Sequence, residues 1–188
     1  MLHPDVIAAI ADELAAADRA HSVIPRITAR YPDATIEDSY AIQGVWRDKN
    51  IAAGRRLVGR KIGLTSKAMQ DATGITEPDY GVMFDDTVYR SGAEIPVDHF
   101  SNVRVEVELA FVLKEPLEGP DCTLEDALGA IDYAVPALEV LNSHIELGAS
   151  ESWQVRTRSS FLLRAIAARA FGAPNRRSLQ RGYADCTS

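Results

Sequence analysis

The sequence predicts a fold of the α+β class, with helices at the N-terminus followed by a mixed β-sheet. Two patterns support this prediction. Apolar residues recur at three- and four-residue spacing in the first fifty residues, as they do on one face of an α-helix. From Leu57 onward, short apolar stretches rich in Val, Ile and Leu are separated by turn residues such as Gly, Pro and Asp. Helices grouped ahead of strands are typical of α+β domains.

Two helices are expected in the N-terminal helical region, residues 1–56. The apolar positions of the first helix are Val6, Ile7, Ile10, Leu14 and Ala17. Pro4 precedes them in the first turn, where its missing backbone N–H costs no helical hydrogen bond. The second helix is expected to begin at Thr35, because Thr35-x-x-Asp38 matches a capping box, and to end at Gly54.

A β-rich region is expected over residues 57–147. Its strand candidates are residues 57–66, 82–89, 94–96, 103–113 and 133–141. The segment EPDYG, residues 77–81, is typical of a turn, and Thr123-x-x-Asp126 caps a short helix before the last strand. Pro136 within that strand indicates an edge position or a bulge, because proline cannot donate a hydrogen bond to a neighbouring strand.

The composition is that of a globular protein and narrows the class of partner. The 188 residues are 46% hydrophobic and 25% charged, and the net charge is −7 with a pI near 5.1. An acidic chain is poorly matched to nucleic acid or to an anionic membrane surface, and no apolar run approaches the ~20 residues that span a bilayer. The N-terminal segment is too acidic for a secretory signal, and Cys122 and Cys186 show no paired spacing. A cytoplasmic protein without nucleic-acid or membrane partners is therefore expected.

Residues 148–188 differ in composition from the rest of the chain. Residues 151–188 hold seven arginines, two acidic residues and no lysine, whereas residues 1–150 hold 13 basic and 25 acidic residues. This change of sign predicts a boundary near Gly148, followed by a basic tail. Within the tail, FLLRAIAARAF (161–171) has the periodicity of an amphipathic helix.

Residues 103–113, VRVEVELAFVL, form the clearest strand pattern in the chain. Alternation places Val105 and Val107 on one face and Glu106 and Glu108 on the other, with the two glutamate Cα atoms about 6.6–6.8 Å apart. A carboxylate is costly to bury unless a cation meets it. Spacing alone leaves two interpretations open: a solvated, charged face of an antiparallel sheet, or a site for a cation.

A third carboxylate, Glu139, interrupts the apolar strand candidate at residues 133–141. Three carboxylates without a neighbouring His or Cys suit Mg²⁺ or Mn²⁺ better than Zn²⁺. Lys61, which lies between glycines in GRKIGLTSK (59–67), is either a surface lysine or a cation that acts as a base or clamps a carboxylate. The glycines match no phosphate-binding loop, and no serine lies in a nucleophile elbow, so nucleotide binding and acyl transfer are not indicated.

Four blocks resemble, in this order and spacing, the hydratase and decarboxylase branch of the fumarylacetoacetate hydrolase superfamily. They are GRKIGLTSKAMQ (59–70), EPDYGVMFDD (77–86), RVEVELAFVL (104–113) and DYAVPALEVLNS (132–143). The resemblance covers about residues 5–147. It implies N-terminal helices followed by the mixed β-sheet or β-roll of that superfamily.

The resemblance also implies a site and an activity. It implies that Glu106, Glu108 and Glu139 are ligands of Mg²⁺ or Mn²⁺ and that Lys61 and Asp79 are catalytic. The implied reaction is hydration of a small 2-oxo acid in aromatic catabolism, from 2-oxo-hept-4-ene-1,7-dioate to 4-hydroxy-2-oxoheptanedioate. Hydratases of 2-hydroxypenta-2,4-dienoate and 4-oxalocrotonate decarboxylases share the same blocks, so these activities stay open. The family forms homo-oligomers, which is expected here as well.

Beyond residue 147 the resemblance ends, whereas members of the family continue further. We therefore expect a partial catalytic β-rich domain at residues 57–147 that is incomplete at its C-terminal side. We interpret the tail as an out-of-frame reading of a GC-rich gene, which favours Arg, Ala, Ser and Gly. The alternative to an enzyme is a catalytically inactive fragment. Sequencing the coding DNA tests the interpretation, and it fails if neither other frame downstream of codon 148 continues the family pattern.

Overall fold

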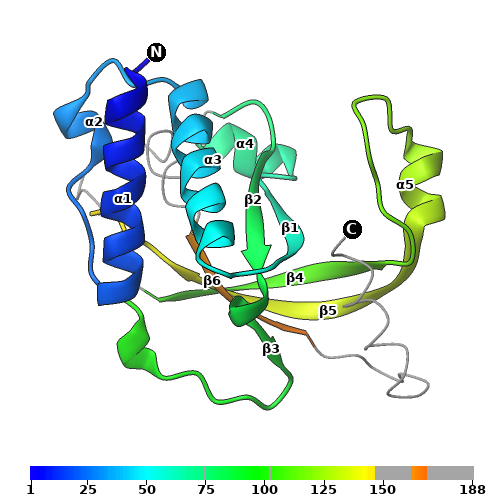
Figure 1. Cartoon of the computed structure of the whole chain (residues 1–188). Coiled ribbons are helices and arrows are strands. Elements are labelled where there is room, and N and C mark those ends of the chain that lie inside the picture. The colour runs from blue at the N-terminus through cyan, green and yellow to red at the C-terminus, as the bar shows by residue number, and fades with distance from the viewer. Residues whose placement is uncertain (74, 102, 147–161, 169–188) are drawn as a thin grey trace.

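The structure, a computed structural model, describes residues 1–73, 75–101, 103–146 and 162–168 and shows helices beside two β-sheets (Figure 1). The helices are α1 (Pro4–Ala20), α2 (Ile27–Arg30), α3 (Ile36–Ala52), α4 (Lys67–Thr73) and α5 (Leu124–Ala130), with single 3-10 turns η1 (Asp85–Thr87) and η2 (Val97–His99). The strands are β1 (Leu57–Gly63), β2 (Asp79–Phe84), β3 (Val88–Arg90), β4 (Arg104–Leu113), β5 (Ile131–Asn142) and β6 (Leu162–Ala168). The predicted α+β class is confirmed.

The two predicted N-terminal helices are present as α1 and α3, which lie side by side (Figure 1). The buried residues of α1 are Ile7, Ile10, Ala11, Leu14 and Ala17, which is the predicted apolar face. α3 begins after the capping box at Thr35 and ends at Ala52. Gly54 follows with a φ of +97°, a left-handed conformation that favours glycine after a helix. The short helices α2 and α4 were not predicted, because four and seven residues are too few to show a periodic pattern.

Asp38 connects the start of α3 to the N-terminus of the chain. Its side chain is fully buried and accepts hydrogen bonds from the backbone N–H of Leu2 at 2.6 Å and of Thr35 at 2.9 Å. The hydrogen bond from the Thr35 backbone, followed by that from Leu2, lowers the pKa of the Asp38 carboxyl below its ordinary value. The carboxylate form is therefore the one that stabilises this corner of the fold.

We expect an Asp38→Asn substitution to destabilise the protein at neutral pH, with a difference that shrinks in acid. Because the pKa of Asp38 is lower in the folded than in the unfolded state, its contribution is fully present above the unfolded-state pKa of about 3.9. It is lost as the pH falls through the folded-state pKa. Urea unfolding of both proteins from pH 7 to pH 3 checks this, and a difference that grows on acidification contradicts it.

The strands form two sheets, and these sheets position the residues that the sequence predicts for the site. β1 and β2 pair antiparallel, and Lys61 lies opposite Gly81 while Gly63 lies opposite Asp79. The second sheet has the order β3-β6-β5-β4, in which β3 and β6 are parallel and the other pairs antiparallel. The predicted mixed sheet is thus confirmed. In Figure 1, α1, α3 and the β1–β2 pair lie above the sheet formed by β4, β5 and β6.

The two faces of the β4–β5 pair carry different side chains and differ in their contacts. On β5, Val135, Ala137 and Glu139 are buried, while Ala134, Pro136 and Leu138 are exposed. The exposed face continues on β4, where the apolar side chains of Val105, Val107, Leu109 and Phe111 are exposed, Val107 by 83%. Val103, just before β4, is exposed as well. The face that carries the glutamates is therefore the one toward β1, and the opposite, apolar face is exposed in the described part of the chain.

Three strand and helix predictions need correction. Residues 162–168 of the predicted tail helix form strand β6, because they pair with β3 and β5 and tertiary pairing overrides local helical periodicity. The other residues of that predicted helix, 161 and 169–171, lie outside the described residues. Residues 94–96 are not a strand, since they lie between a turn and η2 without a neighbour to pair with in the described residues. Residues 82–89 are divided between β2 and β3 by η1, and Asp79 and Tyr80 of the predicted turn already belong to β2.

Pro136 lies where a proline can be tolerated in this sheet. It is opposite Leu109 of β4, and the pairing of β5 with β6 begins one residue later, at Ala137. From Ala137 to Leu141 strand β5 pairs with β6 on one side and with β4 on the other, so Pro136 lies just before the two-sided part of the strand.

The hydrophobic core joins the N-terminal helices to β2. Ile10 and Leu14 of α1, Trp46 of α3 and Phe84 of β2 are all buried in one cluster. The Trp46 and Phe84 rings meet edge to face at 5.5 Å between centroids. This packing fixes the β1–β2 pair against the helices. Across the described ranges, no helix has the length and hydrophobicity that crossing a membrane requires.

Candidate metal centre

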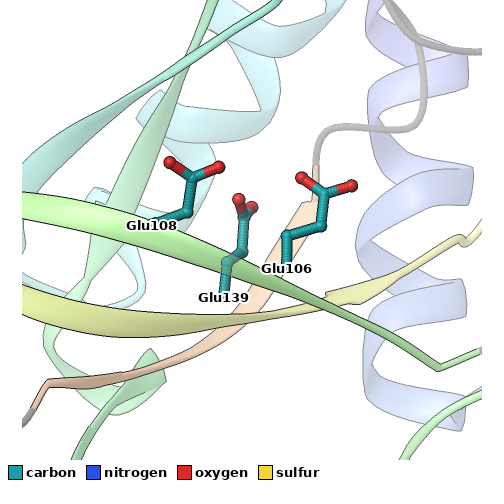
Figure 2. A group of neighbouring side chains, drawn as sticks. All are labelled: Glu106, Glu108 and Glu139. Carbon is teal, nitrogen blue, oxygen red and sulfur yellow. The ribbon is translucent and has the colours of Figure 1, made fainter.

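Three glutamates from two neighbouring strands converge on one face of the larger sheet. Glu106 of β4 lies directly opposite Glu139 of β5, and Glu108 is two residues further along β4, opposite Ala137. Figure 2 shows their carboxylate groups pointing to the same side of the sheet, with Glu139 between the other two in this view. The alternation inferred for β4 therefore puts Glu106 and Glu108 on the face that β5 completes with Glu139.

The three carboxylates fit a hard divalent cation. One oxygen from each residue lies within 4.8 Å of the others, so a single ion could touch all three after small side-chain movements. Oxygen is the donor that Mg²⁺ prefers, and Mg²⁺ commonly leaves positions for water or for a chelating substrate. Glu106 and Glu108 are exposed, which leaves the ion accessible from one side, whereas Glu139 is buried. The donor set thus agrees with the ligand set implied by the family resemblance.

Lys61 of β1 reaches the same centre from above the sheet. Its Nζ donates hydrogen bonds to both carboxylate oxygens of Glu139, each at 2.6 Å, across 78 residues of sequence. The side chains are 10% and 1% exposed, so the pair is buried. Lys61 is therefore not the surface lysine that the sequence had left open; it contacts the carboxylate cluster.

The electrostatic environment of Glu139 favours a nearby cation. Burial raises the pKa of the Glu139 carboxyl, the Lys61 ammonium lowers it in part, and the negative charges of Glu106 and Glu108 raise it further. Three like charges at this distance repel one another, and a positive ion among them relieves that repulsion. The three carboxylates therefore repel one another, and they are arranged in a geometry that suits a bound cation.

Asp79 lies on the β1–β2 pair beside the lysine strand. Its side chain is 1% exposed, and its strand position is opposite Gly63, two residues along β1 from Lys61. Side chains two residues apart on a strand share a face, so Gly63 and Lys61 are on the same side of β1. A Cβ atom at Gly63 would lie 2.3 Å from Oδ1 of Asp79, which is far inside van der Waals contact. The carboxylate of Asp79 thus occupies the space that a side chain at residue 63 would need.

A Gly63→Ala substitution is expected to displace the Asp79 carboxylate while the strand pairing is retained. The backbone of Gly63 has no positive φ, so alanine is unfavourable there only because of the contact with Asp79. If Asp79 takes part in the reaction, kcat falls by roughly tenfold or more, since small misplacements of reacting groups are costly. Kinetics and circular dichroism of the variant check this, with Gly59→Ala on the same strand as the control.

The control substitution has room that Gly63 lacks. A Cβ at Gly59 would meet the Met83 side chain at 3.5 Å, which is ordinary contact. Equal losses of kcat in both variants would contradict a specific role for the space at Gly63. The sequence placed Gly63 beside Lys61 but gave no sign of this role, because the close approach to Asp79 arises only when β1 and β2 pair.

Comparison with known proteins places these residues in a defined class of enzyme. The chain is 52% identical over 134 residues to 2-oxo-hept-4-ene-1,7-dioate hydratase of Escherichia coli, a match that covers 71% of this chain and 50% of that protein. It is 36% identical over 152 residues to 2-hydroxypent-2,4-dienoate hydratase of Pseudomonas putida, covering 80% of this chain and 66% of the relative. The chain therefore spans between half and two thirds of the length of these relatives.

A solved structure shows the same fold. The 4-oxalocrotonate decarboxylase from Pseudomonas putida G7, complexed with magnesium and adipate, superposes with a TM-score of 0.81 at 28% sequence identity. The match covers 90% of this chain and 64% of that one. A second structure of the same protein contains calcium and acetate. No family model matches the chain.

Fold and sequence together place the chain among relatives that are named hydratases and decarboxylases. The chain belongs to the hydratase and decarboxylase branch of the fumarylacetoacetate hydrolase superfamily. The resemblance stated from the four sequence blocks is confirmed.

Proposed function

We propose that this protein is a divalent-metal-dependent hydratase that adds water to 2-oxo-hept-4-ene-1,7-dioate and releases 4-hydroxy-2-oxoheptanedioate. The proposal rests mainly on one observation: three glutamates from β4 and β5 present oxygens within 4.8 Å of one another. The 52% identity to an E. coli enzyme of that name supports the choice of substrate.

Glu106, Glu108 and Glu139 would hold Mg²⁺, or Mn²⁺ in its place. The magnesium and calcium in the related decarboxylase support a divalent ion. When bound, such an ion supplies a Lewis acid for the carboxylate and 2-oxo oxygens of the substrate. The exposed side of the cluster, at Glu106 and Glu108, is the side from which a chelating substrate can approach.

Lys61 and Asp79 are the chain's own candidates for proton transfer and positioning. The contact of Lys61 Nζ with both oxygens of Glu139 supports a clamp that holds this carboxylate in place. Asp79 lies on the same β1–β2 pair with its carboxyl group buried, and a carboxyl group in such a place can accept or deliver a proton. We also propose that the protein is cytoplasmic and that it forms a homo-oligomer.

Two sibling reactions compete with this proposal. Relatives at 34% and 44% identity are named 4-oxalocrotonate decarboxylase and 2-keto-4-pentenoate hydratase. Purified protein should therefore be offered 2-oxo-hept-4-ene-1,7-dioate, 2-hydroxypenta-2,4-dienoate and 4-oxalocrotonate side by side. The highest kcat/KM is expected for the first, and a preference for either other compound reassigns the substrate.

The metal dependence is tested in the same assay. Activity should require Mg²⁺ and vanish in EDTA, and Glu106→Gln should lower kcat/KM by at least about 100-fold, since even the partners of metal ligands contribute about 10–100-fold. Glu115→Gln, the same change at an exposed residue just beyond β4, serves as the control and should leave the rate unchanged. Activity that survives both EDTA and Glu106→Gln contradicts the metal centre, and a complete lack of turnover points to an inactive fragment.

A further inference from the structure

The buried lysine of the centre is in an unusual position for a residue beside a cation site. Lys61 donates hydrogen bonds to both oxygens of Glu139, the one buried glutamate of the three. These are the oxygens that a metal ion at the three-carboxylate cluster must also use. The Lys61 ammonium group and a bound metal ion would therefore both interact with the carboxylate of Glu139.

We propose that Lys61 is the built-in counter-ion of Glu139, which a divalent ion must partly displace when it binds. This inference rests on the proposed function, because it concerns the same metal centre, and it names a determinant of metal binding. Lys61 thus acts as a positioning residue on the metal side of the reaction. It weakens the affinity for the ion while it keeps Glu139 in place without one.

The burial of Glu139 requires such a counter-ion. An ionised carboxylate away from water is strongly disfavoured unless a charged partner and hydrogen bonds compensate it. Glu139 is 1% exposed, and Lys61 donates one hydrogen bond to each of its two carboxylate oxygens. The neighbouring carboxylates of Glu106 and Glu108 add repulsion, not compensation. The ammonium group thus supports the charged form in which Glu139 can act as a ligand.

The same ammonium group opposes a second cation. A carboxylate oxygen has lone pairs enough to accept an N–H and also to bind a metal, so Lys61 and the ion can share Glu139. Two positive groups within a few ångströms nevertheless repel each other, and the lysine must loosen as the ion approaches. A divalent ion can offset this loss because Glu106 and Glu108 supply two further negative charges.

Lys61→Met and Lys61→Gln test this inference without substrate. The wild-type protein and both variants are prepared with Mg²⁺ present throughout, stripped with EDTA, and titrated with MgCl₂ by calorimetry. We expect the dissociation constant for Mg²⁺ to fall on the order of tenfold in the variants. We also expect a lower melting temperature in EDTA than in the wild type, and a larger rise when Mg²⁺ is restored.

Arg60→Met is the matched control for these variants. Arg60 is the neighbour of Lys61 on β1, is exposed, and lies on the opposite face of the strand, so the substitution removes the same charge without touching Glu139. Its dissociation constant for Mg²⁺ should change by no more than about twofold. A tenfold effect at Arg60 as well would show that general charge, and not the contact with Glu139, sets the affinity, and would overturn the inference.

The outcomes separate this inference from the proposed function. If wild-type protein binds no Mg²⁺, the metal centre itself is wrong. If wild type binds Mg²⁺ and the Lys61 variants bind it equally or more weakly, only the counter-ion role is wrong. A Lys61→Met or Lys61→Gln chain that does not fold even with Mg²⁺ present also contradicts the role, since the ion would then be unable to replace the lysine at Glu139.

Discussion

Glu139→Gln is expected to cause the largest combined loss of stability and metal binding of any single substitution at the centre. It removes one of three ligands and also leaves the Lys61 ammonium, 10% exposed, without the carboxylate that it contacts through two hydrogen bonds. Removing one partner of a buried ion pair typically costs about 3–5 kcal/mol of the free energy of unfolding. Denaturant unfolding in EDTA should show this loss, and Mg²⁺ should no longer raise the melting temperature.

The matched variants Glu106→Gln and Glu108→Gln separate the two effects. Both residues are exposed, so their loss should change the free energy of unfolding in EDTA by no more than about 0.5 kcal/mol. Removing one of three neighbouring negative charges also relieves repulsion on Glu139. Both variants should nevertheless lose the stabilisation by Mg²⁺. Equal stability losses at all three positions in EDTA would contradict the distinct burial of Glu139.

Phe84→Ala is expected to be the most damaging change in the core. The side chain is 1% exposed and lies where β2 meets the helices, with the Trp46 ring at its edge and the Arg55 guanidinium 4.3 Å from its ring centroid. Truncation of a buried phenylalanine removes its packing and leaves a cavity, which costs about 3–5 kcal/mol. Because β2 also carries Asp79, the variant should lose Mg²⁺-dependent activity at temperatures where the wild type is still folded.

Tyr80→Ala on the same strand is the control for that experiment. Tyr80 is 53% exposed and stacks on Tyr40 of α3 at 4.6 Å between ring centroids. An exposed stacked pair contributes about 1 kcal/mol, so its loss should be clearly smaller than that of Phe84. Chemical unfolding of both variants at pH 7 measures the difference. Equal losses in the free energy of unfolding would mean that Phe84 does not anchor β2 to the helices.

Helix ends and strand alternation could be predicted from local sequence because they depend on neighbours along the chain. The capping box at Thr35 and Asp38, the apolar face of α1 and the alternation that puts Glu106 and Glu108 on one face are all confirmed in the structure. Each is set by contacts within a few residues, where helical or strand periodicity is a direct guide.

Residues 162–168 show where local periodicity fails. The pattern FLLRAIAARAF suits a helix by itself, yet Leu162–Ala168 pairs with β3 on one side and β5 on the other. A strand partner far away in sequence decides this conformation, and a window of eleven residues contains no information about it. The apolar side of β4 is a second case, since alternation identified that side but gave no indication that its side chains would be exposed.

At the centre, local sequence was enough to predict which residues carry charge and that Glu106 and Glu108 share one side of β4. It did not determine that Glu139 lies opposite Glu106, that Lys61 reaches Glu139 across 78 residues, or that Asp79 fills the space beside Gly63. These relations depend on the pairing register of β4 with β5 and of β1 with β2, and on the packing of one sheet above the other. Register and packing are fixed by burial of the whole core, so the difference between an exposed glutamate and a buried one emerged only on folding.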